Sequence, residues 1–313
     1  MNHPKFISIV GQTATGKTAK AFALAKLWYQ KYHQEVVVIS ADSKQVFTEL
    51  EILSGADVPK DFKKKSNENI PYSFFINPDL PIFLHGTNCL NGNQEWSVGH
   101  FHNLVKKLIE NHPESLFIVV GGTGLYHQQI YHPAETLHVK PNQELREALA
   151  NNTLAELQVI LENKNPEKLA NMNNSDRNNP RRLVRAIETV AAEIEPSHYP
   201  QIEPLLQIGL TTTNIEEKIR QRVLKRLEQG VIEEVKNFET KYQEPNLQAK
   251  ATLGYQEILK FINQEINNKQ LIEHWTLAET QYAKRQTTWW KKRENIQWSE
   301  ANKLDLAEVI SKL

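Results

Sequence analysis

A stretch of eight residues near the N-terminus narrows the folds that are open to this chain. Gly11–Thr18 reads GQTATGKT and fits the pattern G-x-x-x-x-G-K-[ST]. The apolar run Phe6–Val10 precedes it and is typical of a strand buried on both faces, while the Ala- and Leu-rich segment 17–31 favours a helix. A strand, a Gly-rich turn and a helix in this order predict a P-loop, in which backbone N–H groups at a helix N-terminus surround phosphate oxygens.

The expected phosphate site uses every position of this motif. Lys17 would pair with phosphate, and the hydroxyl group of Thr18 suits a magnesium ion. The motif does not say what reacts at the phosphate. The phosphate-binding residues that we expect are Gly11, Gln12, Thr13, Ala14, Thr15, Gly16, Lys17 and Thr18.

Apolar strands and helices alternate along much of the chain. Val36–Ser40, Leu116–Val120 and Leu205–Leu210 read as further strands, and we expect a short strand near 296–298. Residues 57–96, which are rich in Pro, Asn, Lys and Gly, are interpreted as loops over the sheet. The fold class that follows is α/β, with a P-loop NTPase-like parallel sheet flanked by helices and a ligand site at the carboxyl ends of the strands.

A change of composition divides the chain. Between 131 and 200 the sequence becomes rich in Ala, Leu, Glu and Asn at helical spacing, broken by Asn pairs and a proline. We therefore expect residues 1–130 and 201–313 to form the α/β catalytic core with its C-terminal helices. Residues 131–200 are predicted to form a helical insertion.

The charge balance and the cysteine content limit the classes of protein. Among 313 residues, 37 are Lys or Arg and 37 are Asp or Glu, so a polyanion must be held by local basic clusters. The single cysteine, Cys89, excludes an intramolecular disulfide and fits a reducing compartment. Because the N-terminal apolar run is too short for a signal peptide or a membrane span, we expect a cytoplasmic protein.

Two predicted strands end in polar turns beside the P-loop. Asp42 follows strand 36–40, where it could be a metal ligand, a general base or simply a helix cap. Strand 116–120 runs into a Gly-rich turn without the acidic residue that P-loop nucleotidases usually carry there. This absence argues against ATP hydrolysis.

Basic residues gather in three places. Lys218, Arg222 and Arg226 recur every four residues beside an apolar stripe, and of the three Arg222 is expected to point into a cleft, where a guanidinium suits pyrophosphate. The other clusters are 177–185 and 284–293. The latter, with Tyr282 just before it, mixes cations with aromatic residues and no acid, which suits backbone phosphates and stacked bases, although helical spacing favours a core role for Tyr282 and Trp289.

Six blocks of sequence, taken in order, resemble the tRNA dimethylallyltransferases. The resemblance covers nearly the whole chain and implies transfer of a dimethylallyl group from dimethylallyl pyrophosphate to the N6 amine of adenosine at tRNA position 37, beside the anticodon. The products would be N6-isopentenyladenosine and pyrophosphate. The blocks are Gly11–Thr18, Asp42–Phe47, Gly121–Tyr126, Arg181–Arg185, Gly254–Tyr255 and Ala283–Trp289.

The resemblance also implies a role for individual residues. Asp42 matches the general base, and Thr13 and Arg222 match positions that stabilise the departing pyrophosphate together with Lys17 and Mg²⁺ near Thr18. The target base would be flipped into a channel between core and insertion. Positions that match tRNA contacts, or that we add from the basic clusters, are Asp42, Ser43, Lys44, Gln45, Thr123, Arg181, Arg182, Leu183, Val184, Arg185, Lys284 and Arg285.

The sequence departs from the usual pattern of that family in three places. Residues 48–56 replace a Gly-Met-Asp-Ile-Gly-Thr-Ala-Lys pattern, 70–75 stand where a His-His pair is usual, and Lys218 replaces an arginine. These departures concern the edge of the allyl pocket and the fit of tRNA. With one cysteine and no finger domain of the eukaryotic kind, the chain is expected to be a bacterial-type member that acts as a monomer away from membranes.

Three other functions remain open at this point. A prenyltransferase acting on free adenine nucleotides would share the P-loop and the Asp42 block, but it would need neither the insertion nor the 284–293 cluster. A small-molecule kinase would lack its second carboxylate. A tRNA-binding protein without catalysis would have no need for four residues that are intact here, namely Lys17, Thr18, Asp42 and Arg222.

Overall fold

The chain forms two compact units. The computed structural model describes residues 4–192, 202–243, 245–311 and 313. One unit comprises 1–132 with 201–313, and the other comprises 133–200. The boundaries therefore fall at 132/133 and 200/201, where the sequence suggested 130/131 and 200/201.

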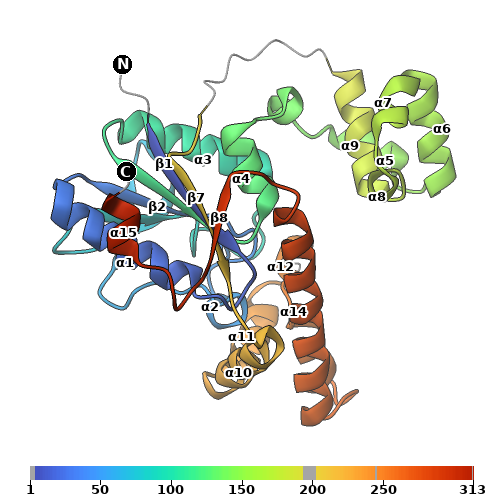
Figure 1. Cartoon of the computed structure of the whole chain (residues 1–313). Helices are drawn as coiled ribbons and strands as arrows, with labels where there is room; N and C mark the ends of the chain where they lie inside the picture. Colours follow the sequence, from blue (N-terminus) through green and yellow to red (C-terminus); the bar gives the residue numbers. More distant parts are fainter. Residues whose placement is uncertain (1–3, 193–201, 244, 312) are drawn as a thin grey trace. The chain divides into compact units, whose positions relative to one another are not determined.

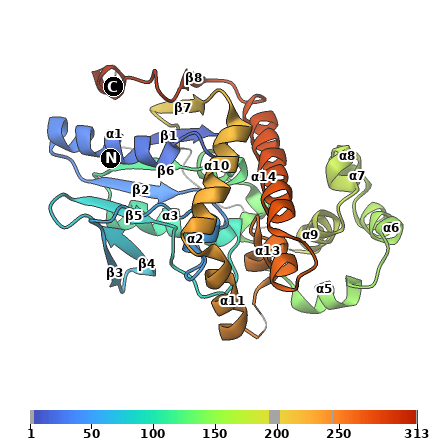
Figure 2. The same cartoon turned by 90° about the horizontal axis from the view of Figure 1, so that it is seen from below.

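The larger unit is built on a mixed sheet (Figure 1), whose strands follow the order β3-β4-β5-β2-β6-β1-β7-β8 and are all labelled in Figure 2. The strands from β5 to β8 in this order run parallel, and β3 and β4 form an antiparallel hairpin at one edge. The predicted P-loop NTPase-like α/β class is confirmed. The strands are β1 (Lys5–Gly11), β2 (Val36–Ser40), β3 (Lys63–Asn67), β4 (Ile70–Ile76), β5 (Ile82–His85), β6 (Leu116–Val120), β7 (Leu206–Thr211) and β8 (Ile296–Glu300).

The interpretation of residues 57–96 as loops was wrong, because β3, β4 and β5 all lie there. β3 reads KKKSN and every side chain of it is exposed, so it lacks the apolar alternation that marks a strand. Lysines on such an edge strand prevent pairing with other chains, which explains a strand made of polar residues. β5 has only four residues, too few for its pattern to stand out.

Helices cover both faces of the sheet. Successive side chains of a strand point to opposite faces, so Phe6 and Val37 enter one core while Ile7 and Val38 enter the other. The first core is covered by α3, α4, α11, α13 and α14, and the second by α1 and α15. The helices are α1 (Lys17–Tyr32), α2 (Glu51–Ser54), α3 (Val98–Asn111), α4 (Gly124–Tyr131), α10 (Ile215–Glu228), α11 (Val231–Lys241), α12 (Leu247–Lys250), α13 (Tyr255–Ile262), α14 (Asn268–Trp290) and α15 (Leu306–Ser311).

The smaller unit is helical, and polar caps set its helix starts. The side chains of Thr153, Asn165, Asn173 and Asn179 each accept a hydrogen bond from a backbone N–H of the first turn. Leucines of α5 and α6 pack with Leu183, Ala186 and Ile187 of α9 to form its own small core. Its elements are a 3₁₀ turn, η1 (Glu135–His138), and the helices α5 (Gln143–Leu149), α6 (Leu154–Lys164), α7 (Pro166–Asn171), α8 (Asn174–Arg177) and α9 (Pro180–Ala191).

Two long helices, α10 and α14, lie next to the carboxyl ends of the strands (Figure 2). α10 and α14 pack against each other, and Figure 2 shows them side by side in front of the strand ends. β1, β2 and β6 are the neighbouring central strands that end at this edge. In the described part of the chain no helix is long and apolar enough to cross a membrane.

Candidate active site

The P-loop connects β1 to α1 and requires its two glycines. Gly11 has a φ of 128°, and a Cβ atom there would lie 2.4 Å from the carbonyl oxygen of Leu210 on β7. Gly16 has a φ of 79° and caps α1. Both conformations disfavour L side chains, so the glycines of the motif are explained by backbone geometry.

Lys17 is held inside the loop by its own neighbours. Its ammonium group donates a hydrogen bond to the carbonyl oxygen of Gln12, and the hydroxyl of Thr15 donates to the same oxygen at 2.8 Å. The pKa of Lys17 is lowered from 10.5 to about 7, mainly by burial and also by the positive charge of Arg222, while the charge of Asp42 partly opposes both effects. A bound anion would favour the charged form of this lysine.

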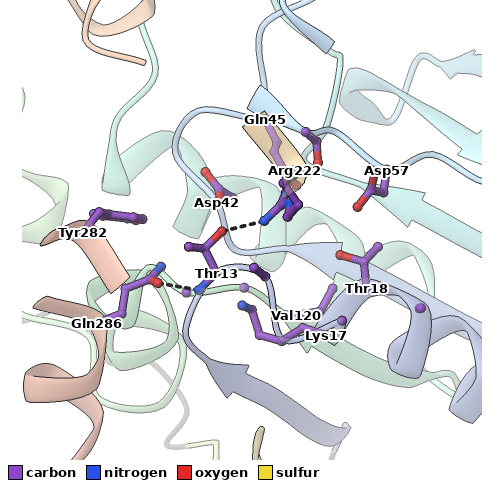
Figure 3. A pocket seen from close by; sticks show the side chains of 16 residues that line it. Thr13, Lys17, Thr18, Asp42, Gln45, Asp57, Val120, Arg222, Tyr282 and Gln286 are labelled. Atoms are coloured by element: carbon purple, nitrogen blue, oxygen red, sulfur yellow. Dashed lines mark hydrogen bonds between the residues drawn. The ribbon is translucent and has the colours of Figure 1, made fainter. Parts of the chain in front are cut away.

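Arg222 reaches the P-loop from α10. Its guanidinium group donates a hydrogen bond to the hydroxyl oxygen of Thr13 at 2.8 Å (Figure 3). Burial is the main cause that lowers the pKa of Arg222, with a further contribution from the charge of Arg226. One turn away Arg226 forms a buried ion pair with Glu279 on α14, whereas Lys218 is exposed and donates to the hydroxyl of Thr212.

The basic ridge predicted on α10 therefore divides into three different environments. Arg222 lines a cavity of about 300 Å³, Arg226 is tied to a buried carboxylate, and Lys218 is exposed. The apolar stripe beside them, with Ile219 and Val223 fully buried, fixes the rotation of the helix. This rotation directs Arg222 into the pocket.

Asp42 stands at the end of β2 between two cavities. It lines the cavity of about 300 Å³ together with Lys17 and Arg222, and a second cavity of about 280 Å³. One carboxylate oxygen accepts a hydrogen bond from the backbone N–H of Lys44 at 2.9 Å, which orients the side chain. This leaves carboxylate lone pairs available for chemistry.

Helix α14 supplies site residues that the sequence analysis did not single out. The side-chain oxygen of Gln286 accepts a hydrogen bond from the backbone N–H of Thr13 at 2.7 Å (Figure 3), and the side chain of Gln12 donates to Thr287. Tyr282 lines both cavities instead of entering the core that we favoured for it. The signals for Gln286 were its position inside the basic cluster 284–293 and inside the block Ala283–Trp289.

The glycines after β6 make room for α14. A Cβ atom at Gly122 would lie 1.8 Å from the side-chain nitrogen of Gln286, and one at Gly124 would lie 1.8 Å from the indole nitrogen of Trp289. The Gly-rich turn that lacks an acidic residue is therefore a docking surface for this helix. Small residues there let α14 approach the P-loop.

Oxygen ligands for a cation are present in the same pocket. The hydroxyl of Thr18 and the carboxylates of Asp42 and Asp57 line it (Figure 3). The described residues contain no cluster of three or more His, Cys, Asp or Glu side chains that could hold a metal alone. A hard cation here would thus need ligands from a bound phosphate as well. Asp57 was not predicted as a site residue, because it lies in a segment interpreted as loop.

The basic residues of α9 differ in exposure and partners. Arg181 is exposed and makes no hydrogen bond or ion pair with the residues that the structure describes, whereas Arg182 pairs with Asp176. Arg185 pairs with Glu188 and donates to the backbone carbonyl oxygens of Thr136 and Val139. It therefore holds the small unit together.

Two residues of the expected tRNA-contacting set are apolar and belong to the core of the small unit. The side chain of Leu183 is 0% exposed and packs in this core, and Val184 is half-buried against it. The side chain of Leu183 is therefore not available to a ligand, and a contact of this position with tRNA stays a prediction. Its apolar side chain instead closes α9 onto α6.

The remaining predicted residues border the pocket or lie on α14. Ser43 lines the second cavity, and the side chain of Gln45 donates to the carbonyl oxygen of Gly55 at 3.0 Å. The ammonium group of Lys44 donates to the carbonyl oxygen of Gln248 at 2.7 Å. Thr123 precedes α4 and is half-buried, and Lys284 and Arg285 are exposed.

Comparison with known proteins agrees with this geometry. The family described as "IPP transferase" matches residues 82–293, which is more than half of the chain, and "Isopentenyl transferase" matches residues 4–70. The tRNA dimethylallyltransferase of a Nostoc species is 31% identical, with 98% of this chain and 97% of the relative covered. That of Alkaliphilus oremlandii is also 31% identical, with coverage of 98% and 95%.

Solved structures resemble the chain over its whole length. The tRNA isopentenylpyrophosphate transferase of Bacillus halodurans is 26% identical with a TM-score of 0.64, and covers 98% of this chain and 93% of its own. A eukaryotic dimethylallyltransferase acting on tRNA shares the fold, with a TM-score of 0.72 at 21% identity and coverage of 97% and 75%. With its P-loop pocket, its full-length relatives and its matched family, the chain belongs to the IPP transferase family, that of the tRNA dimethylallyltransferases.

Proposed function

We propose that the protein transfers a dimethylallyl group from dimethylallyl pyrophosphate to the N6 amine of adenosine 37 in tRNA. One observation carries the proposal: a phosphate pocket and a carboxylate meet at the carboxyl edge of β1, β2 and β6, with Asp42 lining both this pocket and the cavity beside it. The family membership of the chain supports the same reaction. N6-isopentenyladenosine and pyrophosphate would be the products.

The reaction needs a proton acceptor and a site for the leaving group. The N6 nitrogen forms a bond to the allylic carbon while the bond from this carbon to the pyrophosphate oxygen breaks. We assign the N6 proton to the carboxylate of Asp42. The negative charge that develops on pyrophosphate would be stabilised by Lys17, by Arg222 and by the backbone N–H groups of the P-loop.

Thr13 would act through two contacts. Its hydroxyl accepts a hydrogen bond from Arg222, and its backbone N–H donates to Gln286. It therefore joins the arginine of α10 and the helix α14 to the phosphate loop. In this arrangement the leaving-group site is assembled from three elements before substrate binds.

A magnesium ion fits the oxygen-rich side of the pocket. Thr18 is the P-loop hydroxyl that would hold the ion, with pyrophosphate oxygens and water as further ligands. Once bound, the ion would neutralise charge on the leaving pyrophosphate. Hydroxyl and carboxylate oxygens are the ligands that Mg²⁺ prefers.

The RNA would be held by basic residues and not by a global charge, because the chain is neutral overall. Arg181, Lys284 and Arg285 are exposed and are proposed to contact phosphates, and Arg182 and the Ser43–Gln45 turn are proposed as further RNA contacts. The amine of a stacked adenine is inaccessible, so the base must be flipped out of its stack. Because tRNA is the substrate, we propose that the enzyme acts in the cytoplasm, as a monomer.

A product analysis tests this function. The purified protein is incubated with labelled dimethylallyl pyrophosphate, Mg²⁺ and either unmodified tRNA or AMP, and the nucleosides are then separated. Label in N6-isopentenyladenosine from tRNA is the expected result. Label on AMP alone would identify a prenyltransferase of free nucleotides, and transfer to neither acceptor would contradict the proposal.

A further inference from the structure

Asp57 is a charged residue of the phosphate pocket that the reaction described above does not use. It lies after α2, is exposed, and lines the cavity with Lys17, Thr18 and Arg222. Its carboxylate makes no hydrogen bond or ion pair with any residue that the structure describes. In Figure 3 it points toward the same part of the pocket as the hydroxyl of Thr18.

The backbone around Asp57 is fixed by contacts on both sides. Gly55 has a φ of 64°, and a Cβ atom there would lie 2.8 Å from a guanidinium nitrogen of Arg222 and 2.6 Å from one of Arg226. The backbone N–H of Ala56 donates to the carbonyl oxygen of Glu51 at 3.0 Å, and Val58 packs against the core over α1. This loop therefore holds Asp57 at the pocket as part of the fold.

A carboxylate in this position would oppose the binding of pyrophosphate unless a cation stood between them. Two like charges a few ångströms apart repel, and the repulsion grows as water is excluded. A divalent cation reverses the sign of the interaction, because it attracts both the carboxylate and the phosphate oxygens. The turn after β6 reads Gly121-Gly122-Thr123 and offers no acidic side chain for this purpose.

We propose that Asp57 holds, directly or through water, the magnesium ion that Thr18 binds. In this chain it would replace the acidic residue that is missing after β6. The inference rests on the proposed function, since it takes pyrophosphate as the ligand of the pocket. Its prediction concerns the dependence of pyrophosphate binding on Mg²⁺, which can be measured without turnover.

The experiment uses the full-length chain, inorganic pyrophosphate and the Asp57→Asn variant. Calorimetry gives the affinity for pyrophosphate over a range of Mg²⁺ concentrations, and electron paramagnetic resonance gives the affinity for Mn²⁺ in the presence of pyrophosphate. We expect the Mg²⁺ concentration needed for half-maximal pyrophosphate binding to rise about 10- to 100-fold in the variant. Without metal, pyrophosphate should bind the variant as well as the wild type, or more tightly, because a repulsive charge is gone.

Two further variants make the test specific. Asp57→Glu keeps the carboxylate and should retain part of the Mn²⁺ affinity. Glu68→Gln removes an exposed acid in the turn between β3 and β4, away from the pocket. This control variant should change neither the Mg²⁺ dependence of pyrophosphate binding nor the affinity for Mn²⁺. Melting curves of all variants verify that each is folded.

The results separate this inference from its rivals. Asp57 also favours the charged form of Arg222, so its role could be to orient that arginine. In that case Asp57→Asn would weaken pyrophosphate binding equally with and without metal, which would overturn the inference. An Mg²⁺ dependence that is unchanged in the variant would overturn the inference about Asp57 and leave the proposed function standing. A wild-type protein that binds no pyrophosphate at all would overturn both.

Discussion

The charged residues of the pocket have two different proposed roles: the cations bind the anionic pyrophosphate, and the carboxylate accepts a proton. Lys17 in the P-loop and Arg222 beside it are partly buried cations, and Asp42 is a carboxylate with one backbone contact. Burying cations without an anion costs free energy, which lowers the pKa of Lys17. That cost would be recovered when a polyanion binds.

Replacement of Asp42 tests the proton acceptor. We expect Asp42→Ala to lower the single-turnover rate of prenyl transfer by roughly 10²–10⁴, while the affinity for tRNA changes little. Single-turnover kinetics and filter binding measure the two quantities. Asp42→Asn, which keeps the shape, should lose as much rate, and a comparable loss of tRNA affinity would argue against the base assignment.

The pKa of Lys17 predicts a pH dependence of pyrophosphate binding. Lys17 has a pKa of about 7 in the protein without ligand, and a bound anion raises this pKa. Above pH 7, Lys17 must therefore take up a proton when pyrophosphate binds. From pH 7 to pH 9 the affinity contributed by this group should fall, by at most about tenfold per pH unit. Calorimetry in buffers of different ionisation enthalpy measures the proton uptake. In Lys17→Met binding should be weaker and this uptake should be absent; an unchanged uptake would assign it to another group.

At the level of elements, α10 and α14 each contact the P-loop through a hydrogen bond between residues that are far apart in the sequence. Gln286 and Thr13 are 273 residues apart, and Arg222 and Thr13 are 209 apart. The small residues Gly122 and Gly124 set how closely α14 can approach. The geometry of the phosphate loop thus depends on helices at the other end of the chain.

A double-mutant cycle tests this coupling. Gln286→Ala leaves the N–H of Thr13 without its partner, and a net hydrogen bond is worth about 0.5–1.5 kcal/mol, so we expect pyrophosphate affinity to fall about 2- to 10-fold. Gly122→Ala alone should have a similar effect, because its methyl group displaces the same side chain. The double variant should be no worse than Gln286→Ala. If the losses of pyrophosphate affinity in the two single variants added up in the double variant, the two residues would not act through the same Thr13–Gln286 contact.

At the level of the whole molecule, a neutral chain must concentrate its cations to hold RNA. Arg181 and Lys284 are exposed on different units, whereas Arg185 is tied to carbonyl oxygens and to Glu188. Proximity of basic residues in the sequence thus does not give them equal access to a ligand. Exposure and internal pairing decide which of them can meet phosphate.

Salt dependence measures these contacts. We expect Arg181→Ala and Lys284→Ala each to reduce the slope of log affinity for tRNA against log salt by about one, with prenyl transfer at saturating tRNA little changed. Fluorescence anisotropy over a salt series gives the slope. Arg220→Ala, which removes an exposed arginine outside both clusters, is the matched control. If Arg181→Ala and Lys284→Ala gave the same slopes as the control, the two clusters would be solvated surface that does not contact RNA phosphates.

The sequence by itself determined the features that depend on neighbours along the chain. The P-loop, strands β1, β2, β6 and β7, and the position of Asp42 at a strand end follow from local periodicity and from glycine geometry. The parallel α/β class follows from the alternation of strands and helices. These features could be predicted because each is encoded within about ten to twenty residues.

Only the tertiary structure decided what distant segments contribute. The hairpin β3–β4 owes its pairing to an edge position, and Asp57 reaches the pocket from the connection that follows β2. Tyr282 and Gln286 reach it because α14 packs against α10 and against the glycines after β6. Arg181 and Leu183 look alike as members of one motif, yet one is exposed and the other buried, since a helix packs only one face. Contacts between residues far apart in the sequence leave no local pattern, and these contacts complete the pocket.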